Sequence, residues 1–222
     1  MATKKNDNLK PVSKAHVVYK TSDGTRVPGA TTITGLLNKP YLIKWANNLG
    51  LEGIDSSKYT DEAAAVGTLA HQMVQDHLQK RPTVSTSYSQ LQIDLASNSF
   101  LSYLHWEEGH KIEPIICEVP MVSEQRKYGG TVDCYCILDG VPTIVDFKTG
   151  KAVYDEYFVQ VAAYKELLIE HGHPVDQIKI LRIGRDETEG FEERTVTDSR
   201  DYFSIFERLL DIYYLKKKLK WS

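Results

Sequence analysis

The sequence has few cysteines, no long apolar run and no marked excess of charge of either sign. Three cysteines in 222 residues are too few, and an odd number, for the disulfide framework of a small secreted domain. No apolar run reaches the ~18 residues that a membrane-spanning helix needs. The first ten residues are polar and resemble no secretory signal. We therefore expect a cytoplasmic protein with no membrane partner.

The charge balance leaves the binding partner open. A formal charge of −3 gives no global attraction to a polyanion, so any such partner would have to meet a local basic patch or a bound cation. With 41% hydrophobic and 26% charged residues, the composition is that of an ordinary globular protein and excludes general disorder. We expect a mobile tail over residues 1–15 and a single domain over residues 16–222, without internal repeats.

Hydrophobic spacing divides the domain into two parts. Residues 16–110 are predicted to hold a small hairpin around Ser22-Asp23-Gly24 and then helices, and residues 111–222 a sheet with flanking helices. The predicted helices begin at a cap on Thr31 or Thr32, then cover residues up to Gly50, about 60–80, 90–108, 154–170 and a closing segment that ends in lysines. The predicted strands cover 115–122, 130–138, 143–147, 178–183 and 191–196. This order predicts an α/β fold.

Two carboxylates are predicted to face each other across the hairpin that turns at Asp139-Gly140. A two-residue loop places Asp133 directly opposite Asp146, about 5 Å away, where like charges are destabilising. A four-residue loop would place Asp133 opposite Lys148 instead, but strand alternation keeps all three polar side chains on one face in either case. The other face would hold core residues: Val132, Cys134, Cys136, Val145 and Phe147. Charged hairpin faces are common, so this segment alone favours an ordinary hairpin face with its charges in water.

Other residues add to the pattern, although each has an ordinary structural explanation. Glu118 lies within an otherwise apolar predicted strand, where a charge is costly unless it is paired or bound to a metal. His71 lies on the buried face of a predicted helix, where a lone histidine is more often a core residue than a ligand. Gln160 and Tyr164 lie four residues apart on one face of the helix after the Asp146–Lys148 strand.

Taken in order, these residues resemble the motifs of the PD-(D/E)xK nucleases. The resemblance is to the RecB-like branch, which includes phage and mitochondrial genome maintenance exonucleases and the CRISPR-adaptation nucleases. The motifs are Gly67-Thr68-Leu69-Ala70-His71, Glu118, Gly130-Thr131-Val132-Asp133, Ile144-Val145-Asp146-Phe147-Lys148-Thr149-Gly150 and Gln160-Val161-Ala162-Ala163-Tyr164. Residues 27–33 and Trp45 also resemble the N-terminal segment of the phage and mitochondrial enzymes, with Gly29-Ala30 where serine and valine are commoner.

The resemblance implies a restriction-endonuclease-like core, in which a central mixed sheet is flanked by helices and an N-terminal helical extension arches over the site. It also implies one or two Mg²⁺ or Mn²⁺ ions, held by His71, Asp133, Asp146 and the Phe147 carbonyl, with Glu118 holding a water or a second ion. An imidazole ligand tilts such a site toward Mn²⁺. Lys148 would act on the attacked phosphate, and Gln160 and Tyr164 would position the strand or Lys148. An iron–sulfur cluster needs four ligands, so three cysteines predict none.

The implied activity is a metal-dependent DNase, most simply an exonuclease on single strands or DNA ends. It would act in recombination, repair or replication in a bacterial or phage-infected cell, with partner proteins of those processes. An endonuclease and a catalytically idle DNA-binding module are the alternatives. Helices at residues 32–50 and 90–108 could roof the cleft, and Trp106 could stack on bases. The predicted DNA contacts are Thr31, Thr32, Trp45, Arg126, Lys127, Tyr128 and Lys151.

Overall fold

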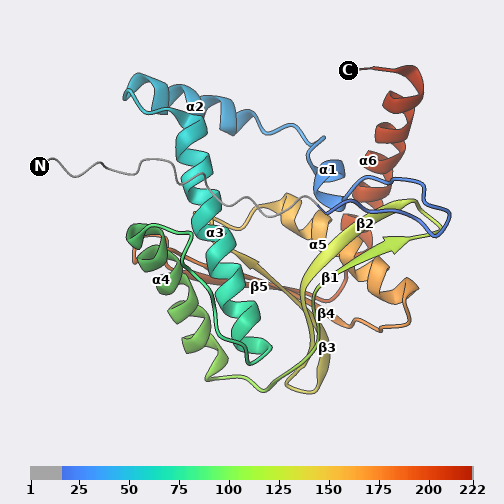
Figure 1. Cartoon of the computed structure of the whole chain (residues 1–222). Coiled ribbons are helices and arrows are strands. Elements are labelled where there is room, and N and C mark those ends of the chain that lie inside the picture. Colours follow the sequence, from blue (N-terminus) through green and yellow to red (C-terminus); the bar gives the residue numbers. More distant parts are fainter. Residues whose placement is uncertain (1–16, 222) are drawn as a thin grey trace, which may run out of the picture.

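Five strands form one mixed sheet whose order in space follows their order in the chain (Figure 1). The computed structural model describes residues 17–221. The strands are β1 (Ile112–Ser123), β2 (Tyr128–Leu138), β3 (Val141–Lys148), β4 (Gln177–Ile183) and β5 (Phe191–Val196). Neighbouring strands are antiparallel except β3 and β4, which are parallel. The α/β fold class predicted from the sequence is thus confirmed.

Helices cover both faces of this sheet. They are α1 (Ala30–Thr34), α2 (Pro40–Leu51), α3 (Ser56–Leu78), α4 (Gln90–Glu107), α5 (Asp155–Glu170) and α6 (Arg200–Leu219). On one face Tyr135 and Ile144 pack in a core shared with α1, α5 and α6. On the other, Cys134 and Val145 pack against Val74 of α3 and aromatic residues of α4. No helix within residues 17–221 is long and apolar enough to cross a membrane.

The hairpin between β2 and β3 has a two-residue loop, the shorter of the two loops considered from the sequence. Leu138 pairs with Val141, and both loop residues have positive φ, 52° at Asp139 and 86° at Gly140, as a type I′ turn requires. Asp139 tolerates this conformation because its carboxylate accepts a hydrogen bond from the Lys111 backbone N–H at 2.8 Å and contacts His110 at 2.7 Å. The same register pairs Cys134 with Val145 further along the strands.

The predicted core face of this hairpin is largely confirmed. Cys134, Cys136, Val145 and Phe147 belong to one buried apolar cluster, and all three cysteines are free thiols. Val132 instead joins the buried cluster on the α5 side of the sheet.

The N-terminal part departs from the prediction in local detail. The small hairpin reduces to a single bridge between Lys20 and Arg26, and Gly29 rather than a threonine occupies the N-cap of α1. Helix α3 begins several residues earlier than predicted because the Asp55 carboxylate accepts hydrogen bonds from the backbone N–H groups of Ser57 and Lys58. The spacing of the apolar residues in this helix does not indicate the cap.

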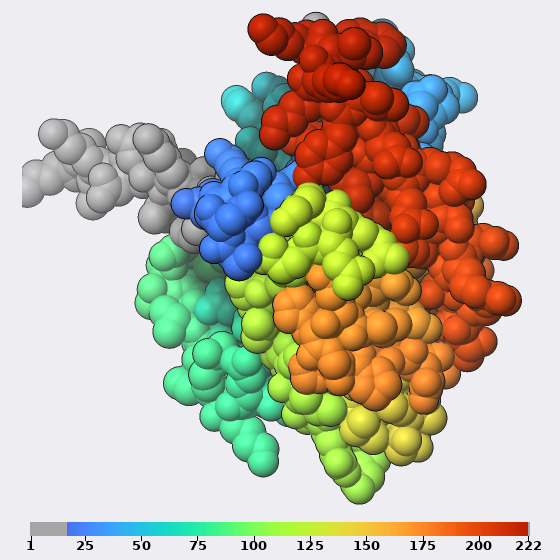
Figure 2. Space-filling model, turned by 90° about the vertical axis from the view of Figure 1, so that its right-hand side faces the viewer, coloured from blue at the N-terminus to red at the C-terminus, as the bar shows by residue number. Residues whose placement is uncertain are grey.

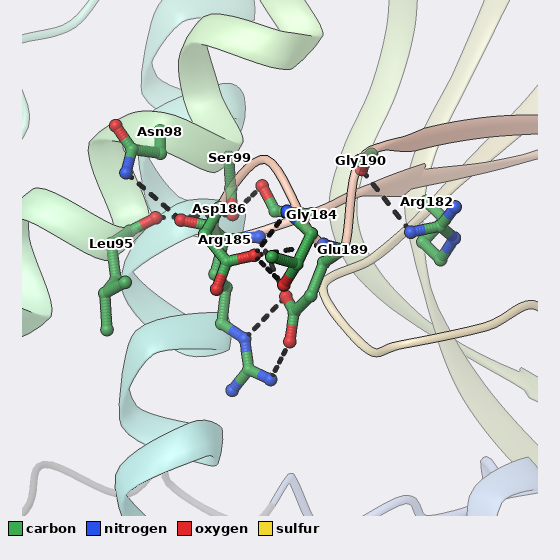
Figure 3. Close-up of polar contacts among 10 residues, drawn as sticks. Leu95, Asn98, Ser99, Arg182, Gly184, Arg185, Asp186, Glu189 and Gly190 are labelled. Atoms are coloured by element: carbon green, nitrogen blue, oxygen red, sulfur yellow. Dashed lines mark hydrogen bonds and ion pairs between the residues drawn. The ribbon is translucent and has the colours of Figure 1, made fainter.

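The turn between β4 and β5 is held against α4 by a polar cluster (Figure 3). Ser99 Oγ donates to the carbonyl of Gly184 at 3.1 Å, and the Asn98 side-chain amide donates to that of Arg185 at 3.1 Å. The Arg185 guanidinium forms a bidentate ion pair with Glu189, and the side chains of the two residues are only 13% and 6% exposed. This pair closes the turn and fixes β5 beside β4.

We predict that Glu189→Gln lowers the free energy of unfolding by about 3 kcal/mol, because it leaves a largely buried guanidinium without its counter-charge. Thermal and urea denaturation measure the loss. Asp198→Asn is the control, since it removes an ion pair with Arg200 that is mostly exposed and should change the melting temperature little. Equal melting temperatures for the parent and Glu189→Gln would contradict this account of the turn.

Candidate metal site

Three carboxylates lie in a row across the first three strands. Cys117 pairs with Cys134 and Val119 with Val132, so Glu118 of β1 faces Asp133 of β2. The β2–β3 pairing ends at Cys134 and Val145, and Asp133 and Asp146 are the next residue on each strand. Asp133 Oδ2 accepts a hydrogen bond from the Phe147 backbone N–H at 3.0 Å. Like charges on neighbouring strands repel, so the row is suited to bind a cation.

Glu118 has an unusual backbone conformation for a strand residue. Its φ of 55° lies in the left-handed region, which is unfavourable for a residue with a Cβ and costs about 1–3 kcal/mol where it is enforced. Such conformations cluster at functional sites. At this position it coincides with the interruption of the β1–β2 ladder that brings the Glu118 carboxylate to Asp133.

Helix α3 contributes a nitrogen ligand to the same place. His71 Nδ1 lies 3.4 Å from Asp133 Oδ2, and ligand atoms of His71, Glu118 and Asp133 all lie within 4.8 Å of one another. The helix can approach because residue 67 is glycine: a Cβ there would lie 2.7 Å from Thr149 Oγ1, in the loop after β3. His71 follows one turn later and points to the carboxylates.

Asp146 and Lys148 form a largely buried ion pair beside this group. Burial raises the pKa of Asp146 to about 6; the charge of Asp133 adds to this rise and Lys148 opposes it. For Lys148, burial disfavours the ammonium, but the negative charges of Asp146 and Asp133 outweigh this and raise its pKa. The Lys148 ammonium also lies 4.9 Å from the centre of the Tyr157 ring.

The residues present fit a divalent cation. Asp146 Oδ2 is fully buried and contacts Lys148 as an ion pair, but it has no partner with hydrogen-bond geometry within residues 17–221. Three carboxylates and one imidazole offer the mixture of oxygen and nitrogen ligands that Mn²⁺ accepts well and Mg²⁺ accepts through oxygen. One lysine does not balance the negative charge of the row, so a bound cation would offset the remaining charge.

Helix α5 supplies the two polar side chains predicted at this position. Gln160 Nε2 donates to the Tyr164 hydroxyl at 2.6 Å. The Tyr164 ring is buried, which raises the pKa of its hydroxyl well above the ordinary value. The ring fits only because residue 130 is glycine, where a Cβ would lie 2.6 Å from Tyr164 Cε1.

All of these polar side chains open onto one cavity of about 1100 Å³. Glu118, Asp133, Asp146 and Lys148 line it from the sheet, His71 from α3, and Gln160 and Tyr164 from α5. The predicted contacts Thr31 and Thr32 line it as well. Its volume lies near the upper end of the ~300–1,000 Å³ that is typical of small-molecule pockets.

Several predicted DNA contacts lie elsewhere. Tyr128 is fully buried and donates a hydrogen bond to the Ala163 carbonyl at 2.8 Å, so its predicted stacking role is wrong. Trp106 of α4 is buried in the core as well. Arg126 and Lys127 form ion pairs with Glu207 and Glu124, away from the cavity lining.

Trp45 and Lys151 also lie outside the cavity lining. Both contact Tyr59: the Trp45 ring packs edge-on at 5.7 Å between ring centres, and the Lys151 ammonium lies 6.0 Å above the ring. The prediction that helices at residues 32–50 and 90–108 cover the cavity is corrected too. Within the described chain the lining includes no residue of α2 or α4, because α4 packs against α3 and the sheet.

Sequence reasoning missed the segment that forms the wall in place of this roof. The missed lining residues include Tyr19, Arg26, Thr131, Tyr213 and Lys217. The Tyr19 hydroxyl forms a hydrogen bond with Thr131 Oγ1 at 2.9 Å, and its ring covers Gly129 so closely that no side chain would fit there. The double glycine before Thr131 was the available signal, since it indicates close approach by rings. No local signal identified Tyr213 or Lys217.

Comparisons with known proteins give only distant likenesses. The sequence matches no family model and no curated protein sequence. Among solved structures, LHK-Exo in complex with dAMP is 13% identical with a TM-score of 0.36, over 68% of this chain and 83% of that chain. SSO0001 is 12% identical with a TM-score of 0.32, over 66% and 72%. At these scores neither likeness carries an argument about function.

We predict that Gly130→Ala destabilises the protein by about 1–3 kcal/mol, the range for overpacking a filled core, because the new methyl group displaces the Tyr164 ring. Urea denaturation measures the change. Gly50→Ala is the matched control: it lies in α2, where an added methyl group would have no atom within 4 Å, and it should leave stability equal or slightly higher. Equal free energies of unfolding for the two variants would show that the fit of Tyr164 against Gly130 is not needed.

Proposed function

We propose that this protein is a metal-dependent DNA nuclease of the PD-(D/E)xK superfamily, in its RecB-like branch, with residues 16–222 as a single nuclease domain. One observation carries the proposal: ligand atoms of His71, Glu118 and Asp133 lie within 4.8 Å of one another, and the buried Asp146–Lys148 ion pair lies beside them. Each matches, residue by residue, the motif positions that the sequence resembles. Such a set is rare on a surface that has no chemistry to perform.

His71, Glu118, Asp133 and Asp146, together with the Phe147 carbonyl, would hold one or two Mg²⁺ or Mn²⁺ ions. When bound, such an ion polarises a phosphate and lowers the pKa of a bound water. The carboxylates would hold the ion, and the strands that carry them keep them in place. No cysteine takes part, since all three are buried in the apolar core.

Lys148 is the residue assigned to charge stabilisation. Its ammonium is kept protonated by Asp146 and Asp133, which raise its pKa, so at neutral pH it can orient a water or neutralise the charge that builds on the attacked phosphate. Gln160 and Tyr164 act as positioning residues at the adjacent wall of the cavity. The hydrogen bond between them fixes the amide of Gln160 at the cavity wall along which the DNA strand would run.

The substrate we propose is DNA, as a single strand or an end, and the reaction an exonucleolytic hydrolysis in recombination, repair or replication. The cavity is large enough to admit a nucleotide-sized segment of such a strand. An endonuclease would use the same residues, so digestion of an end is the feature that distinguishes the two. An idle DNA-binding module would not need Lys148 paired beside three carboxylates.

We predict that end-labelled linear single-stranded DNA is degraded in Mn²⁺ at a rate equal to or above that in Mg²⁺, and not in EDTA. Closed circular single-stranded DNA should survive in the same tube. Gel electrophoresis of both substrates makes the measurement. Cleavage of the circle would assign an endonuclease, and full activity in EDTA would refute the metal site.

A matched pair of lysine variants excludes a contaminating nuclease from this assay. Lys148→Met should reduce the rate by at least about 100-fold, the effect of losing one group that stabilises transition-state charge. Lys165→Met on α5 makes the same change outside the cavity lining and should retain the parent rate. Equal rates in all three proteins would show that the activity does not arise at this site.

A further inference from the structure

Two cations line the cavity in addition to the catalytic group. Among the lining residues of the described chain, the basic side chains other than His71 and Lys148 are Arg26 and Lys217. Arg26 follows the turn at residues 21–24, and Lys217 lies in the last turns of α6. The N-terminal segment and α6 lie side by side, in blue and red in Figure 2, and α1 contacts α6 directly.

Neither cation supports the fold in the part of the chain that the structure describes. Within residues 17–221 neither Arg26 nor Lys217 forms an ion pair or a side-chain hydrogen bond, and both are exposed. Other arginines are paired: Arg182, Arg185 and Arg200 each contact a carboxylate. Because the chain as a whole is negative, attraction of a polyanion depends on such local cations.

Aromatic side chains accompany the two cations. Tyr213 lies one helical turn before Lys217 on the same face of α6, and both line the cavity. Tyr19 lines it beside the N-terminal segment, where its hydroxyl is fixed by Thr131. Cations interleaved with aromatic rings are the arrangement that binds a single strand without sequence preference.

We propose that Arg26 and Lys217 bind the phosphates that flank the scissile phosphate of a single DNA strand. This rests on the proposed nuclease function. The scissile phosphate lies at the carboxylate row, and the strand continues along the wall made by residues 17–32 and α6. The carboxylates repel the phosphates next to the scissile one, so the positions of Arg26 and Lys217 determine the path of the DNA strand out of the row.

The test is binding and cleavage of a fluorescent thymidine 20-mer by the parent, Arg26→Gln and Lys217→Gln. Each variant should raise KM and the dissociation constant at least fivefold and leave kcat within twofold. Each should also reduce the slope of log K against log salt by about 0.7, the value for one phosphate contact on a single strand. Binding is measured by anisotropy with Ca²⁺ in place of Mn²⁺, and cleavage with Mn²⁺.

Lys218→Gln is the matched control, because Lys218 lies in the same lysine-rich turn but does not line the cavity. It should keep the parent KM and salt slope. Unchanged values in Arg26→Gln and Lys217→Gln, an equal loss in Lys218→Gln, or a parent that does not bind the 20-mer would overturn the inference. A parent that binds through both residues but never cleaves would refute the nuclease function and leave the phosphate contacts standing.

Discussion

Repulsion within the row of Glu118, Asp133 and Asp146 is the constraint on which the rest of the site depends. Carboxylates on neighbouring strands destabilise a sheet, and one of these is almost fully buried. Lys148 offsets part of the charge by pairing with Asp146. Burial, aided by the charge of Asp133, raises the pKa of Asp146 to about 6. Packing elsewhere in the fold offsets the cost of this repulsion. A bound cation would relieve it.

Small residues determine how closely the other elements approach this row. Gly67 lets α3 approach the loop after β3, which brings His71 to Asp133. Gly130 gives room to Tyr164 of α5, and Gly129 to Tyr19. The type I′ turn at Asp139-Gly140 fixes the β2–β3 register, which ends at Cys134 and Val145, next to Asp133 and Asp146. Packing and catalytic geometry are therefore set by the same backbone contacts.

The hairpin and its carboxylates could be predicted from the sequence because they depend on local rules: turn type, register and strand alternation. The buried cysteines followed from the same alternation. Tyr128 could not be judged in this way, since its burial comes from Phe206 of α6 and the Ala163 carbonyl of α5, which are distant in sequence. Arg26 and Lys217 were missed for the same reason: only the tertiary fold brings residues 17–32 and α6 to the cavity.

A crystal of the protein soaked in Mn²⁺ tests the central claim most directly, by its anomalous difference map. The account predicts a peak within bonding distance, about 2.0–2.3 Å by analogy with other divalent ions, of His71, Asp133 and at least one of Glu118 and Asp146. A fully soaked crystal with no peak at this group, or with Mn²⁺ bound only at surface carboxylates, would show that the row is not a metal site.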